Sequence, residues 1–161
     1  LGFALLIVFF TQIFRTNKSQ QSRVVRIIQK SLLFLLIVFF VYHGIGLGFR
    51  SYISGHAPWS NGYEALIYIA WMTVLAGLSF IRKNEVVVAG AAILASLMIM
   101  VSELNLLDPE ITPLVPVLKS YWLMIHVSII VASYGPFALG MILGLVSLIL
   151  ILFTNEKNKA K

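Results

Sequence analysis

The sequence predicts an all-α fold, a polytopic bundle of about five transmembrane helices, and three observations lead to this class. Hydrophobic residues make up 60% of the chain and charged residues only 11%, and the mean hydropathy is +0.95. A soluble domain of this size carries about twice that charged fraction. The apolar residues also form long runs, and runs of this length suit a helix that crosses the bilayer. Finally, the basic residues cluster in alternate segments between these runs, as the positive-inside rule requires.

The apolar runs set the expected helices within a single transmembrane domain that covers residues 1–161. The ranges are about 1–14, 31–49, 62–81, 86–102 and 122–153. The first of them spans only about 21 Å at 1.5 Å per residue, which is too short for a hydrocarbon core of about 30 Å. We therefore expect it to be the cut end of a longer helix, and the chain to be a fragment of a larger protein.

The distribution of basic residues predicts the orientation of the chain. Segments 15–30, 82–85 and 154–161 hold ten of the twelve lysines and arginines. By the positive-inside rule these segments face the cytoplasm, so the loops 50–61 and 103–121 face outward. We expect an integral protein of the bacterial inner membrane, surrounded by the lipid bilayer. Because the net charge of +6 lies in these orienting clusters, no nucleic acid is expected as a partner.

The last apolar run is longer than a crossing requires. Thirty-two helical residues would reach about 48 Å, against a core of about 30 Å. With the cytoplasmic end fixed by the charged tail, the first turns should project above the core on the outer side. His126 lies in these turns, and Pro136 further along should bend the helix.

Three histidines, His43, His56 and His126, fall at or beyond the outer ends of the expected helices. Histidine is a common ligand of haem iron and other transition metals. Trp122 lies one helical turn before His126 on the same face, where an indole could flank a flat macrocycle. A belt tryptophan beside a solvated histidine explains the same pattern equally well. His43 suits a haem ligand, a proton relay or, as the favoured reading, a hydrogen bond to a neighbouring helix, whereas His56 suits an ordinary loop residue.

Other patterns favour structural roles. Asn61 and Glu64 have the spacing of a capping box that would start the third helix. Two glycine pairs have the GxxxG spacing of closely packed membrane helices: Gly44 with Gly48, and Gly140 with Gly144. The chain has no cysteine, so it offers no thiol nucleophile or disulfide. The sequence also lacks a nucleophile triad, a phosphate loop and a calcium loop.

Two stretches, residues 50–71 and 107–135, resemble the CcsA (ResC) family of cytochrome c biogenesis proteins, most closely the fused CcsBA type. In the second stretch a proline-rich outer loop leads into a helix that opens with Trp122 and His126. The first stretch matches the family pattern P-x-S-N-x-Y-E at five residues: Pro58, Ser60, Asn61, Tyr63 and Glu64.

This resemblance implies a function. Members of the family deliver haem b to the outer side of the membrane and position it for thioether attachment to the CxxCH motif of apocytochrome c. The implied partners are haem, apocytochrome c and a CcsB/ResB-type subunit or fused domain. His126 corresponds to the first external histidine that ligates the haem iron, and the parent protein would act as a holocytochrome c synthase.

The chain departs from the family pattern in one respect. The tryptophan-rich WWD motif that cradles the haem in the family is absent before the chain stops at Lys161. The later histidines of the family, one external and one within the membrane, which follow the helix containing His126, are absent as well. We therefore expect at most one half of the axial ligand pair, and a fragment that is inactive alone. Two alternatives remain at this stage: a segment of a transporter or channel, and a structural scaffold without a haem site. The apolar runs contain almost no ionisable residues, which counts against an ion-coupled transporter.

Overall fold

The computed structural model describes residues 23–82, 84–104, 107, 109–111 and 120–153, and these residues form four α-helices without a strand. The helices are α2 (Arg23–Ser54), α3 (Gly62–Ser79), α4 (Glu85–Glu103) and α5 (Tyr121–Phe153). All four are long and apolar enough to cross a membrane. The all-α prediction is therefore confirmed, while the expected helix at 1–14 lies outside the described residues.

Helix α2 is longer than the sequence predicted. Its 32 residues begin and end well outside the expected range of 31–49. The prediction followed hydropathy, but the polar segment before residue 31 has no proline or glycine and includes good helix formers, so the helix starts earlier. The helix ends where Gly55 adopts a positive φ of 68° and donates its N–H to the carbonyl of Ser51 (3.0 Å). Glycine is the usual residue for this left-handed C-terminal cap.

Helix α3 begins at the predicted cap. The Asn61 side chain accepts a hydrogen bond from the Glu64 N–H (2.8 Å), as an N-cap residue should. The reciprocal half of a capping box differs, because the Glu64 carboxylate accepts from the N–H of Ser60 instead of Asn61. Helix α3 ends two residues before the expected position 81, and α4 and α5 match their expected ranges to within one residue.

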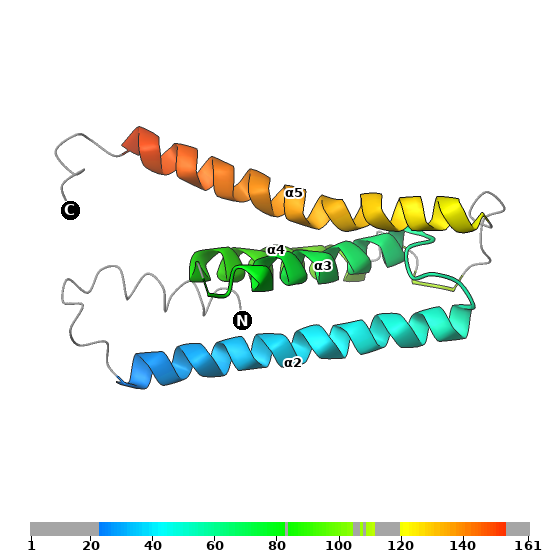
Figure 1. The fold of residues 1–161 in the computed structure, drawn as a ribbon, viewed down its shortest axis with the longest axis horizontal. Helices are drawn as coiled ribbons and strands as arrows, with labels where there is room; N and C mark the ends of the chain where they lie inside the picture. The colour runs from blue at the N-terminus through cyan, green and yellow to red at the C-terminus, as the bar shows by residue number, and fades with distance from the viewer. Residues whose placement is uncertain (1–22, 83, 105–106, 108, 112–119, 154–161) are drawn as a thin grey trace.

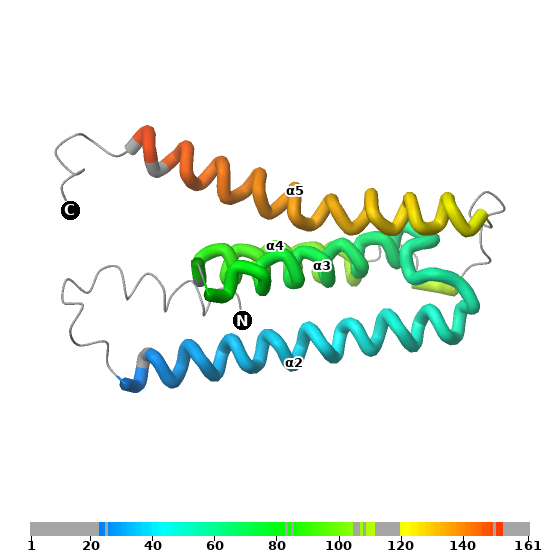
Figure 2. Tube along the Cα trace, viewed as in Figure 1, coloured from blue at the N-terminus to red at the C-terminus, as the bar shows by residue number. Residues whose placement is uncertain are grey.

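Helices α3 and α4 form the centre of the bundle, and α2 and α5 lie on either side of this pair (Figures 1 and 2). Small residues dominate the core between them, which lets the helix backbones approach closely. At the α3–α4 contact, a Cβ added to Gly77 would collide with Ala91. The buried residues of the main core cluster are Leu36, Ala70, Val74, Val88, Ala89, Ala92 and Ala95.

The expected GxxxG pairs contribute less packing than their spacing suggests. At Gly44 an added Cβ would lie 3.1 Å from the indole nitrogen of Trp71, so this glycine does allow α2 to approach α3. That indole donates to the Phe40 carbonyl (3.1 Å), and the Phe40 and Trp71 rings stack with centroids 4.8 Å apart. The other three glycines, Gly48, Gly140 and Gly144, have no described atom within 4 Å of an added Cβ.

Gly135 instead allows a close approach of α5 to α3. An added Cβ there would lie 2.5 Å from the Thr73 hydroxyl and 2.9 Å from the Ile69 carbonyl. The next residue is Pro136, inside the helix, and α5 bends near its middle (Figure 1). A proline within a helix removes one backbone hydrogen bond and kinks it, as the sequence predicted.

The connections alternate between the two ends of the bundle. The end of α2 and the starts of α3 and α5 lie together at one end, whereas the start of α2 and the end of α5 lie at the other (Figure 1). The connection 55–61, shorter than the predicted loop 50–61 because α2 continues to Ser54, therefore shares an end with the described residues between α4 and α5. The turn at Arg82, between α3 and α4, lies at the opposite end, in agreement with the predicted alternation of basic segments.

Candidate functional site

His126 and Trp122, the predicted haem-binding residues, lie in the first two turns of α5. Both are exposed, Trp122 to 77%. The Trp122 ring meets the ring of Tyr121 edge-on, with centroids 5.9 Å apart. Among the described residues, none forms a hydrogen bond or ion pair with the His126 ring. A neutral imidazole in this setting has a nitrogen lone pair available for a metal.

His126 lies at an exposed position in the part of α5 that precedes its contact with α3. The helix is held against α3 at Gly135, nine residues after His126. At 1.5 Å per residue the imidazole therefore lies about 13 Å along the axis from that contact. The arrangement can supply one axial ligand to an iron, with an indole one turn away as a flanking surface.

The other two histidines lie elsewhere. The His56 side chain is only 6% exposed, with Nδ1 3.1 Å from the Ala57 carbonyl and 3.9 Å from a Glu64 carboxylate oxygen. His43 lines a groove formed by α2, α3 and α4, which does not include His126. Within the described part of the chain, no three His, Cys, Asp or Glu side chains come close enough to hold a metal ion. The three histidines thus do not form one site.

A fully buried carboxylate organises the loops at this end of the bundle. Glu64 accepts hydrogen bonds from Arg50 Nε (3.0 Å) and from the backbone N–H of Ser60 (2.9 Å). The Arg50 side chain is 17% exposed, so both members of the ion pair are largely removed from water. We call Arg50, Ser60, Asn61 and Glu64, together with the carbonyls of Pro109 and Glu110, the Arg50–Glu64 cluster.

The Arg50–Glu64 cluster connects the end of α2 and the start of α3 to Pro109 and Glu110, which follow α4. Arg50 Nη2 donates to the carbonyls of Pro109 (2.8 Å) and Glu110 (3.3 Å), and the Asn61 amide also donates to the Glu110 carbonyl (3.4 Å). The guanidinium of Arg50 lies over the Tyr63 ring, 5.1 Å from its centroid. Sequence analysis treated Glu64 only as a helix cap and missed Arg50. The available signal was an arginine and a glutamate at the facing ends of two apolar helices, where charged residues usually pair.

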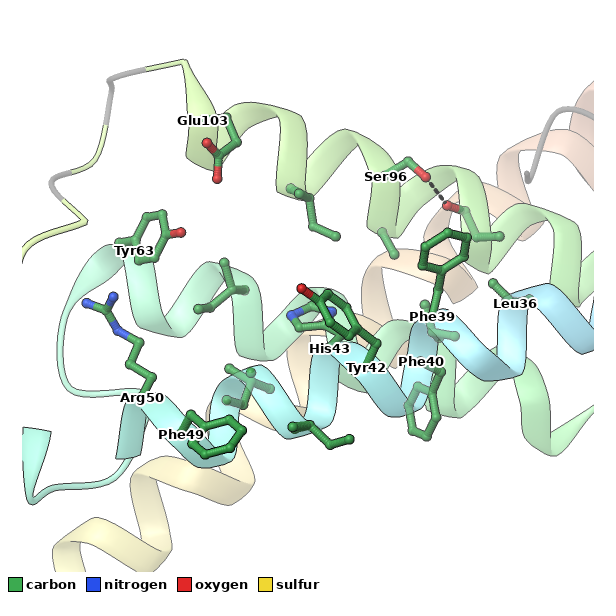
Figure 3. Close-up of a pocket in the computed structure, with 18 of the residues that line it drawn as sticks. Leu36, Phe39, Phe40, Tyr42, His43, Phe49, Arg50, Tyr63, Ser96 and Glu103 are labelled. Atoms are coloured by element: carbon green, nitrogen blue, oxygen red, sulfur yellow. Dashed lines mark hydrogen bonds between the residues drawn. The ribbon is translucent and has the colours of Figure 1, made fainter. Parts of the chain in front are cut away.

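A second feature that sequence analysis missed is a groove of about 1000 Å³ between α2, α3 and α4. Its walls are mostly aliphatic and aromatic, and its polar side chains include His43, Arg50, Tyr63 and Glu103 (Figure 3). No single stretch of sequence reveals this groove, because its lining comes from three helices.

Comparison with known proteins identifies the family. The model of a family described as cytochrome c assembly protein matches residues 59–161, almost two thirds of the chain. The chain belongs to this family. The match includes Glu64, Trp122 and His126. The resemblance to CcsA proteins is thereby confirmed, and membership supports a role in cytochrome c maturation. Together with the apolar helices it identifies a multi-pass integral membrane protein.

Individual relatives agree with this assignment. The chain is 43% identical over 119 residues to Protein NrfI of Wolinella succinogenes. The aligned region covers 74% of the chain and 13% of NrfI. It is 34% identical to the cytochrome c biogenesis protein CcsA of Guillardia theta, over 71% of the chain and 40% of that protein. It is 38% identical to CcsA of Prochlorococcus marinus, over 67% of the chain and 34% of that protein. The chain therefore spans less than half the length of each of these relatives.

Proposed function

We propose that this protein handles haem b in the membrane and presents it on the outer face for attachment to apocytochrome c. His126 serves as one axial ligand of the haem iron and Trp122 flanks the porphyrin. The observation that carries the proposal is the exposed His126 side chain near the start of α5, without a partner among the described residues. Family membership supplies the second support, because cytochrome c assembly requires haem.

The chemistry needed from this chain is ligation. Iron takes the lone pair of a neutral imidazole, so a protonated His126 could not bind it. Each thioether bond forms when a thiol S–H adds across a haem vinyl group. Because the chain has no cysteine, both thiols come from apocytochrome c. Among the described residues the proposal assigns one iron ligand, His126, so a second ligand would come from elsewhere in the whole protein or from a CcsB/ResB-type partner.

The Arg50–Glu64 cluster supports this role by holding Pro109 and Glu110, which precede the haem-binding helix in the chain. Arg50 and Asn61 hold the carbonyls of Pro109 and Glu110, and the chain then continues to α5. These contacts hold Pro109 and Glu110 at the same end of the bundle as His126, where the haem would be presented to a secreted apocytochrome.

Replacing His126 tests the proposal. The natural protein should be purified from its membrane with bound haem, and His126→Ala should deplete the haem or alter its Soret absorbance because an axial ligand is lost. Cytochrome c maturation should fall by an order of magnitude or more, and added imidazole should restore part of the spectrum. The matched control is Ile129→Ala, which removes another exposed side chain from the same helix. Unchanged absorbance and unchanged maturation in His126→Ala would remove this residue from the mechanism.

The same experiment separates the two alternatives. A structural scaffold predicts that His126→Ala has no effect. A transporter for ions needs a series of ionisable groups along the spans. Among the described helices, Arg50 and Glu64 pair with each other at one end of the bundle and do not form such a series.

A further inference from the structure

The groove between α2, α3 and α4 holds a polar group that the haem proposal does not use. We propose that this groove is a binding site for a membrane quinone or quinol, a neutral ring with two ring oxygens and an isoprenoid tail. The site is separate from His126, which is not among the groove residues.

The polar group in the groove is His43. Its side chain lines the groove (Figure 3), and no described residue forms a hydrogen bond or ion pair with it. Arg50 follows seven residues later on the same face of α2, at the polar rim where it pairs with Glu64. His43 therefore lies about 10 Å deeper than this ion pair, at 1.5 Å per residue. A histidine within a membrane span is costly without a polar partner and marks a functional site by default.

The depth of His43 limits the chemistry of the partner. A phospholipid keeps its polar atoms near the rim and offers only methylene groups further down. A quinone can place its ring in the apolar region and give the imidazole an oxygen to bond. Aromatic side chains from α2, Phe39, Tyr42 and Phe49, line the groove on either side of His43 along the helix (Figure 3). The rest of the lining is mostly aliphatic and suits an isoprenoid tail, and about 1000 Å³ is ample for a ligand of this size.

The charges at the rim favour a neutral ligand over a second porphyrin. Haem carries two anionic propionates, which would need cations. Arg50 is already paired with the buried carboxylate of Glu64. The other charged lining residue is Glu103, whose carboxylate would repel a propionate (Figure 3). A quinone carries no charge, so it needs no cation at the rim and is not repelled by Glu103.

The proposal is tested with a photoreactive short-chain azidoquinone on the purified natural protein in lipid nanodiscs. Labelling should map to peptides of α2 and α4 and be displaced by an unmodified short-chain quinone. His43→Phe keeps an aromatic ring but removes the hydrogen bond, and should weaken binding about tenfold. Ile99→Trp fills the groove from α4 and leaves His43 in place, and it should abolish labelling. This variant tests the proposal if His43→Phe does not fold. Ile129→Ala, on α5, is the matched control and should leave labelling unchanged.

The haem spectrum distinguishes this inference from the proposed function. His126→Ala should change the haem absorbance and leave quinone labelling intact. His43→Phe should weaken quinone labelling and leave the haem absorbance unchanged. Labelling that survives both His43→Phe and Ile99→Trp would overturn the proposal. A loss of haem absorbance in His43→Phe would also overturn it and would assign the groove to a porphyrin. Co-purified phospholipid that a quinone cannot displace from the groove would assign it to a lipid instead.

Discussion

At the scale of single residues, the most constrained side chain is the carboxylate of Glu64. It is fully buried, and its two oxygens accept bonds from a guanidinium and a backbone N–H. A buried ion pair gives little net stability relative to apolar residues, but removal of one member leaves a charge without compensation in a low-dielectric region. Glu64 therefore matters chiefly as the fixed point that orients Arg50 toward the second loop.

Glu64→Gln tests this dependence. The substitution keeps the shape of the side chain but leaves the Arg50 cation without its counter-ion. We expect a loss of about 3 kcal/mol in the free energy of unfolding, near the lower end for a broken buried pair because Arg50 keeps some contact with water. Thermal unfolding of the purified protein in detergent measures the effect. The control is Glu103→Gln, an exposed carboxylate at the same end of the bundle, which should change stability by less than about 0.5 kcal/mol. Equal effects of the two substitutions would show that the ion pair does not stabilise the loops.

At the scale of helices, close packing depends on which glycines face a neighbour. Gly44 admits the Trp71 indole between α2 and α3, and Gly135 brings α5 onto α3. Gly140, in contrast, has open space around an added Cβ among the described residues. Spacing alone predicted Gly140 and Gly144 as packing residues and passed over Gly135. The pattern of one helix cannot show which of its faces meets another.

Gly135→Ala and Gly140→Ala form a matched pair on one helix. The added methyl group at position 135 would overlap the Thr73 hydroxyl and the backbone of α3, so α5 must shift away. We expect a cost of about 1–3 kcal/mol in the free energy of unfolding. At position 140 the same substitution meets no neighbour and should be neutral or stabilising by up to about 1 kcal/mol through helix propensity. Thermal unfolding of both variants in detergent provides the comparison, and a neutral Gly135→Ala would argue against the α3–α5 contact.

At the scale of the whole molecule, alternating ends of the bundle match alternating charge. The connection 55–61, the described residues between α4 and α5, and the start of α5 share one end. The basic turn at Arg82 lies at the other. Because basic residues remain on the cytoplasmic side during insertion, this arrangement favours an outward position for His126. That position is still a prediction.

Cysteine labelling tests the orientation directly. The chain has no cysteine of its own, so each introduced thiol is the only one within residues 1–161. Tyr121→Cys replaces a side chain that is 72% exposed at the start of α5 and should react with a membrane-impermeant maleimide in intact spheroplasts. Arg82→Cys, also at an exposed position, should react only after the membrane is permeabilised. The opposite pattern would place His126 in the cytoplasm and defeat the proposed presentation of haem to a secreted protein.

The sequence by itself determined the class of this protein, the approximate positions of α3, α4 and α5, the cap at Asn61 and the family. These properties follow from local signals: hydropathy over about twenty residues, capping chemistry within one turn and motifs within short stretches. Tertiary structure alone decided that Arg50 contacts both Glu64 and the residues after α4, and that Gly135 allows α5 to pack on α3. It also decided that His43 lines a groove, whereas His56 packs beside Glu64. Each of these depends on side chains brought together from different helices, and contacts of that kind are set by how the helices pack in three dimensions.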